Sequence, residues 1–211
     1  MRKELIINKS KTIIVILAGG QSRRFGGGYK TLYTFNKISI LNRIIQNFKK
    51  LEVEIVLNAN SNEDQFLKTG LHLIKDELEN FQGPLAGICS SMKWVLENRK
   101  NIEWIFTSPS DTPFLNKNLV NKFLSTDYNN KTKIVIAKSS NKTHPVIGFW
   151  HISLIKSLEE FLAKENRKIM HWVEGQNYEI LNFENKNNFF NINTKTDLEE
   201  AIKIEESLKT L

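Results

Sequence analysis

Residues 13–32 read Ile-Ile-Val-Ile-Leu-Ala-Gly-Gly-Gln-Ser-Arg-Arg-Phe-Gly-Gly-Gly-Tyr-Lys-Thr-Leu. Ile13 to Leu17 form a continuous apolar, mostly β-branched run, which predicts a strand buried on both faces of a parallel sheet. The strand ends before Gly19 and Gly20, where a sharp turn leaves room for another molecule to approach the backbone. The stretch therefore predicts an α/β fold whose first strand runs directly into a binding loop.

The loop after this strand combines glycine with positive charge. It contains Arg23, Arg24, glycine at positions 26–28 and Lys30. Free N–H groups, fixed positive charge and little side-chain bulk suit a polyphosphate, although a glycine-rich turn can also merely reverse the chain. Lys30-Thr31 matches the end of a Walker A loop, but Tyr29 stands where that motif requires glycine, and no G-x-G-x-x-G follows the strand. The combination of features favours phosphate binding over a simple turn.

Strands and helices alternate along the rest of the chain. Apolar runs predict strands at 53–57, 71–74, 104–107, 133–137, 144–150 and 178–183. Helical spacing of apolar residues predicts helices at 40–51, 63–67, 83–99, 116–124, 152–163, 168–174 and 197–208. This order is typical of a Rossmann-like, three-layer sandwich with a mostly parallel sheet. No linker is evident, so we expect an N-terminal extension at 1–12 and a single domain at 13–211.

Composition narrows the class of protein. The chain has 211 residues, 40% of them hydrophobic and 25% charged, as in ordinary globular domains. Its net charge of +7 suits an anionic ligand, and because the positive residues are spread along the chain we do not expect nucleic acid as a partner. With no signal-peptide pattern, no membrane-length apolar run and one cysteine, the sequence predicts a cytoplasmic protein without membrane contact, and we expect a monomer.

Polar side chains follow the predicted parallel strands, where ligands of open α/β sheets bind. Asp111 lies in Pro-Ser-Asp-Thr-Pro at 109–113; it can cap a turn, but opposite a phosphate loop it is a better candidate for a Mg²⁺ ligand. Asp76 is either a simple loop acid or an acceptor for adjacent N–H groups of a ligand. Asn58 can both donate and accept, which suits a base edge or a sugar.

A family resemblance enters with the pattern Leu17-Ala18-Gly19-Gly20-x-Ser22-x-Arg24-Phe25-Gly26-x-x-x-Lys30. It resembles the nucleotidyltransferase signature of the molybdenum cofactor guanylyltransferases, the MobA type. The resemblance implies a nucleotide-diphospho-sugar transferase-like fold and Mg²⁺-dependent transfer of GMP from GTP to molybdopterin, with release of pyrophosphate. It implies catalytic roles for Lys30, Asp111 and Arg24, with Asp111 as the metal ligand. It also implies a nucleotide site formed by Leu17, Ala18, Gly19, Gly20, Lys30, Asn58, Asp76, Gly83 and Asp111.

Two later segments extend the resemblance. Thr143-His144-Pro145-Val146 is similar to the family's His-Pro segment on the pterin side, although a lone histidine is often only a packing residue. The segment at 190–194 resembles the family's closing Asn-x-Asn-Thr motif, in which Asn191 and Asn193 alternate and so share one face of an extended chain. The resemblance therefore implies that His144, Asn191 and Asn193 face the second substrate.

The chain also departs from the family pattern. Tyr29 stands where the family usually has Asp, Ser110 stands where cysteine is common, and Lys-Ile-Ser at 37–39 replaces a Gly-Lys-Pro turn. Two related activities stay open: a cytidylyltransferase on the same cofactor, which the Gly19-Gly20 pair disfavours, and a sugar-phosphate nucleotidyltransferase. A non-catalytic nucleotide-binding protein is the third alternative, and Tyr29 is the feature that encourages it.

Overall fold

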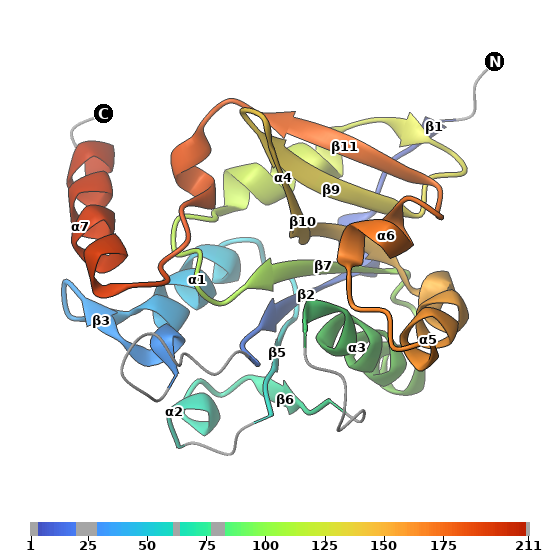
Figure 1. Cartoon of the computed structure of the whole chain (residues 1–211), viewed down its shortest axis with the longest axis horizontal. Helices are drawn as coiled ribbons and strands as arrows, with labels where there is room; N and C mark the ends of the chain where they lie inside the picture. The colour runs from blue at the N-terminus through green and yellow to red at the C-terminus, as the bar shows by residue number, and fades with distance from the viewer. Residues whose placement is uncertain (1–3, 20–28, 61–63, 77–82, 210–211) are drawn as a thin grey trace.

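The computed structural model describes residues 4–19, 29–60, 64–76 and 83–209, and a mixed β-sheet forms its centre (Figure 1). Within these residues, seven strands lie in the order β11-β9-β10-β7-β2-β5-β6. Their bounds are β2 (Thr12–Leu17), β5 (Ile55–Asn58), β6 (His72–Ile74), β7 (Trp104–Pro109), β9 (Ile134–Ser139), β10 (Lys142–His151) and β11 (Tyr178–Phe183). Only β10 runs antiparallel to its neighbours among these pairings. The predicted mostly parallel sheet is confirmed.

Strand β2 lies in the middle of this sheet because its side chains are apolar on both faces. Ile14 and Ile16 belong to the hydrophobic core on one side of the sheet, whereas Ile13 and Val15 belong to the core on the other. All four side chains are fully buried. A strand of this kind needs a covering layer on each face, and β-branched residues pack well there.

Helices form the two covering layers. On one face lie α1 (Ile40–Lys49), α4 (Lys117–Ser125) and α7 (Lys195–Lys209), and on the other lie α3 (Pro84–Asn98), α5 (Ile155–Ala163) and α6 (Ile169–Val173). A short helix, α2 (Asp64–Leu67), buries Phe66 in the first core. The three-layer arrangement agrees with the prediction. The remaining short elements are η1 (Lys9–Lys11), η3 (Lys30–Leu32), β3 (Thr34–Phe35), β4 (Ile38–Ser39), β8 (Tyr128–Asn129), η4 (Ile152–Leu154) and η5 (Lys186–Phe189).

The helix starts follow local capping chemistry. The side chain of Ser39 accepts a hydrogen bond at the start of α1, and that of Asn116 does so at the start of α4. Gly83 precedes α3 with φ +142°, and Pro84 is the first helical residue. At α7, the Thr194 hydroxyl accepts from the Asp197 N–H.

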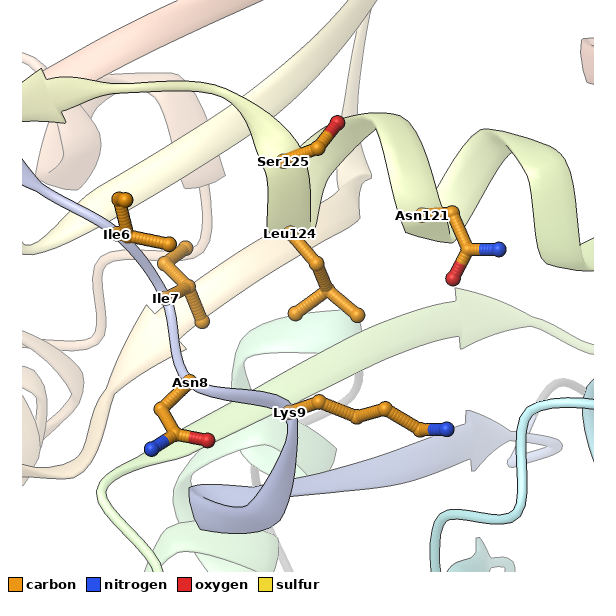
Figure 2. Close-up of a pocket in the computed structure, with 7 residues that line it drawn as sticks. All are labelled: Ile6, Ile7, Asn8, Lys9, Asn121, Leu124 and Ser125. Atoms are coloured by element: carbon orange, nitrogen blue, oxygen red, sulfur yellow. The ribbon is translucent and has the colours of Figure 1, made fainter.

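The segment that we expected to precede the domain packs against the domain. Strand β1 (Glu4–Leu5) pairs with β8, and Ile7 is buried. Figure 2 shows a hollow between this segment and α4, lined by Ile6, Ile7, Asn8, Lys9, Asn121, Leu124 and Ser125. Because Asn8 and Lys9 precede β2, the hollow lies toward the amino end of that strand. Among the described helices, none has the length and apolar character that crossing a membrane requires.

Candidate active site

The candidate site lies where the parallel strands β2, β5, β6 and β7 end. Because these strands run in the same direction, their carboxyl ends meet at one edge of the sheet. Backbone hydrogen bonds hold the following loops together there: the Ala18 N–H donates to the Asn58 carbonyl at 2.8 Å, and the Ser110 N–H donates to the Leu17 carbonyl at 3.0 Å. The predicted residues after β2, β5 and β7 are therefore neighbours.

Lys30 and Asp111 meet at this edge. The Lys30 Nζ lies 2.5 Å from Asp111 Oδ2, and the two side chains are only 18% and 14% exposed. The same ammonium donates to Asn193 Oδ1, also at 2.5 Å. Three segments that are far apart in the sequence thus converge on one cationic group.

The chain before α7 is tied to the Asp111 loop through its backbone. The Ile192 N–H donates to the Asp111 carbonyl at 2.9 Å, and the red segment that leads into α7 crosses this edge of the sheet in Figure 1. The Asp197 carboxylate accepts from the N–H groups of Asn193 and Thr194, each at 2.8 Å. These bonds fix Asn193 beside Lys30.

The oxygen atoms around Lys30 suit a divalent cation. The ammonium lies between a carboxylate oxygen of Asp111 and an amide oxygen of Asn193, so it stands in for a cation between two hard oxygen donors. Mg²⁺ prefers such donors and is commonly held by one or two carboxylates together with substrate phosphates. The donor set therefore fits Mg²⁺, and the Asp111 carboxylate would supply its negative charge.

A second cluster lies at the ends of β5 and β6. Asn58 Nδ2 donates to Asp76 Oδ1 at 2.8 Å, and Asn60 Nδ2 donates to Asp76 Oδ2 at 2.9 Å. The Asp76 N–H donates back to Asn60 Oδ1 at 2.8 Å. The sequence predicts that Asn58 and Asp76 lie at one edge of the sheet but indicates no role for Asn60. The structure makes it the residue that holds the Asp76 carboxylate from the side opposite to Asn58.

Gly87 in α3 completes this cluster. A Cβ atom at Gly87 would lie 2.3 Å from Asn58 Oδ1 and 2.9 Å from Leu17 Cδ2. Among the described residues, a Cβ at Gly83 would meet nothing within 4 Å, so the constraint seen at Gly83 is its positive φ. The family resemblance implies that Gly83 is the binding glycine of this segment, whereas Gly87 is the glycine against which the Asn58 side chain packs.

We predict that Gly87→Ala displaces the Asn58 amide from Asp76. The clash with a buried side chain is expected to lower the free energy of unfolding by about 1–3 kcal/mol. It should also weaken nucleotide binding about tenfold or more, measured by isothermal titration with GTP. Gly175→Ala is the control, because the nearest atom to its added Cβ is 3.4 Å away and both quantities should stay unchanged. Unaltered GTP binding by a folded Gly87→Ala protein would contradict the prediction.

The residues predicted to face a second substrate come from two segments, β10 and the chain before α7, and His144 contacts the second of these through Phe189. The His144 ring stacks on Phe189 with centroids 4.4 Å apart, and its Nε2 lies 2.7 Å from the Ser139 hydroxyl. Burial, and then the charge of Lys142, lowers the pKa of His144 to about 4, so the ring is neutral at neutral pH. Asn191 and Asn193 are exposed on either side of buried Ile192, as expected for alternating residues.

The structure describes only part of the predicted loop after β2. Gly20 and Arg24 fall outside the described residues. Of the rest of that loop, Ala18 is buried and Gly19 is exposed. Tyr29, the departure from the family pattern, packs edge-on against Phe66 with ring centroids 5.1 Å apart. Tyr29 therefore anchors the chain next to Lys30 to the hydrophobic core.

Comparison with known proteins gives consistent findings. Residues 14–179 match the family described as the MobA-like NTP transferase domain. A molybdenum cofactor guanylyltransferase of Nitrobacter hamburgensis is 37% identical over 193 residues, covering 90% of this chain and 92% of that protein. Another, from Haemophilus influenzae, is 34% identical over 189 residues, covering 89% and 96%. The crystal structure of molybdopterin-guanine dinucleotide biosynthesis protein A from Archaeoglobus fulgidus has a TM-score of 0.72 at 19% identity, covering 92% of this chain and 99% of that one. At that identity the likeness concerns the fold alone.

Proposed function

The chain belongs to the MobA-like NTP transferase family, and on that premise we propose that it transfers GMP from GTP to molybdopterin, forming molybdopterin guanine dinucleotide and releasing pyrophosphate. The names of relatives matched over about 90% of the chain support the choice of substrates. The structural observation that carries the proposal is the convergence of Lys30 and Asp111 at the carboxyl ends of the parallel strands. A cation and a carboxylate placed together there can hold a triphosphate and its metal.

The reaction is a nucleophilic substitution at phosphorus. A phosphate oxygen of molybdopterin attacks the α-phosphorus of GTP in line, the bond to the bridging oxygen breaks, and pyrophosphate leaves with the electron pair. Such chemistry depends mainly on positioning and on neutralising charge. Lys30 would contact the phosphates with its ammonium, while Asp111 and Asn193 would present oxygen atoms to Mg²⁺. Bound Mg²⁺ supplies the positive charge that offsets the phosphate oxygens of the leaving group.

The cluster around Asp76 would select the base. Guanine presents its N1–H and its exocyclic amino group side by side, and a carboxylate accepts from both. Asn58 and Asn60 hold the two oxygens of Asp76, which keeps the carboxylate in one orientation. Cytosine offers one exocyclic amino group and no ring N–H at its pairing edge, so this carboxylate favours guanine.

We predict that Asp76→Ala removes the discrimination between GTP and ITP, which lacks the exocyclic amino group of guanine. Hydrogen bonds to a charged group contribute about 1.5–3 kcal/mol, so the GTP dissociation constant should rise about ten- to hundredfold while that of ITP rises less. Titration of both nucleotides into the wild-type and variant proteins measures the ratio. An unchanged GTP-to-ITP ratio would count against base reading by Asp76.

The direct test of the function uses purified protein, Mg²⁺, GTP and molybdopterin. We expect pyrophosphate and the guanine dinucleotide to form in equal amounts, and CTP to replace GTP poorly. Faster turnover with CTP would make the protein a cytidylyltransferase. GTP binding without release of pyrophosphate, when molybdopterin is present, would support the non-catalytic alternative.

A further inference from the structure

The hydroxyl of Thr31 links the chain segment that carries Lys30 to the segment that carries Asp111. Thr31 Oγ1 donates to the Ser110 carbonyl at 2.8 Å, across 79 positions of sequence. Thr31 is 2% exposed and Ser110 is 8% exposed, so the bond is shielded from water. Thr31 directly follows the lysine and Ser110 directly precedes the aspartate. The bond therefore spans the two segments one residue away from the groups that meet.

The two partners of this bond are themselves anchored. Ser110 donates its N–H to the Leu17 carbonyl at the end of β2, which fixes the Asp111 side. On the lysine side, η3 is closed by the bond from the Tyr33 N–H to the Lys30 carbonyl. Thr31 lies within this single turn, and its hydroxyl is a lateral link from the turn to the sheet. A change in that link would shift the Lys30 backbone relative to Asp111.

The sequence context suggests a different use for this side chain. Lys-Thr ends a Walker A loop, where the hydroxyl binds the metal ion. Here the Thr31 hydroxyl donates a buried hydrogen bond to the backbone carbonyl of Ser110. The oxygen atoms beside the ammonium come from Asp111 and Asn193. The Thr31 hydroxyl therefore links the Lys30 turn to the loop that carries Asp111.

We propose that Thr31 is a positioning residue that sets the separation between the Lys30 ammonium and the Asp111 carboxylate. The inference rests on the proposed function for its kinetic consequence. A misplacement of about 1 Å in a reacting assembly can lower a rate by about 100-fold. Because the link acts on the placement of groups around the phosphates, its loss should lower kcat more than it raises KM for GTP.

The test compares three variants of the full chain. Thr31→Val keeps the shape and removes the donor, whereas Thr31→Ser keeps the donor. Thr12→Val is the matched control, since Thr12 is 4% exposed and donates to the Asn8 carbonyl at 3.0 Å, at the amino end of β2. We expect Thr31→Val to lose at least tenfold in kcat with KM for GTP changed less than threefold. Thr31→Ser should restore most of kcat, and Thr12→Val should lower the melting temperature by a similar amount with kcat unchanged.

A crystal structure of Thr31→Val gives a readout independent of turnover. We expect the distance from Lys30 Nζ to Asp111 Oδ2 to lengthen beyond the 4 Å limit of an ion pair. An unchanged pair, or a wild-type kcat in Thr31→Val, would overturn the proposal, as would equal kcat losses in Thr31→Val and Thr12→Val. If the wild-type protein transfers no GMP, the proposed function fails, and the ion-pair distance alone decides whether Thr31 positions the pair.

Discussion

Asp111→Asn is expected to lower kcat for GMP transfer by at least about 10³-fold. The carboxylate is the charged oxygen donor beside Lys30, and the neutral amide keeps its shape but not its charge. Removing a single group that stabilises transition-state charge costs about 10²–10³ in rate, and loss of the proposed metal ligand adds to that. The variant also loses the ion pair between Lys30 and residue 111, so the placement of the Lys30 ammonium should change as well.

The measurement is single-turnover release of pyrophosphate at saturating GTP and molybdopterin, over a range of Mg²⁺ concentrations. Asp127→Asn is a suitable control because Asp127 is an exposed carboxylate before β8. That control should match the wild type at every Mg²⁺ concentration. A folded Asp111→Asn protein that keeps more than about a tenth of wild-type kcat at saturating Mg²⁺ would exclude an essential role for the carboxylate.

Lys30→Met is expected to move two quantities in opposite directions. Its kcat should fall about 10²–10³-fold, because the phosphates lose a fixed positive charge. Binding of a divalent cation to the nucleotide-free protein should become tighter, because the ammonium that lies between Asp111 and Asn193 is gone. Coulomb repulsion between two cations competing for one carboxylate supplies the reason.

Titration of the nucleotide-free protein with Mn²⁺, followed by electron paramagnetic resonance, measures the second effect. Lys11→Met provides a matched control, since Lys11 Nζ forms an ion pair with Glu103 at 2.5 Å but lies next to the amino end of β2. That variant should bind Mn²⁺ as the wild type does. Weaker Mn²⁺ binding in Lys30→Met would show that the ammonium helps to form the metal site. It would refute the prediction that Lys30 and the divalent cation compete for the Asp111 carboxylate.

The fold could be predicted from the sequence because its signals are local. The β-branched run at Ile13 to Leu17 can be buried on both faces only in the middle of a covered sheet, and β2 lies there. Ser39, Asn116 and Thr194 cap helices through bonds within three residues. Residues 4–12 were harder to interpret, because β1 depends on a partner strand, β8, more than a hundred positions away.

The site could be predicted only at the level of which loops meet. The rule that parallel strands share a carboxyl edge brought Lys30 and Asp111 to one place, and the structure joins them. The sequence does not reveal side-chain bonds across long separations, such as Thr31 to Ser110 or Lys30 to Asn193. Gly87 was missed because its requirement comes from Asn58, a residue on another element. The functional roles of these residues stay predictions.

The loop at 110–115 is held almost entirely through its own main chain. Leu17 accepts from the Ser110 N–H, Thr31 and Ile192 bond to the carbonyls of Ser110 and Asp111, and Asn47 donates to the carbonyls of Pro113 and Leu115. These hydrogen bonds use main-chain groups of the loop, so they do not depend on the side chains of Ser110, Pro113 or Leu115. A substitution at position 110 that fits the buried space therefore leaves these main-chain links, and with them the placement of Asp111, in place. The position of the loop depends instead on Thr31 and Asn47, whose side chains supply donors to its carbonyls.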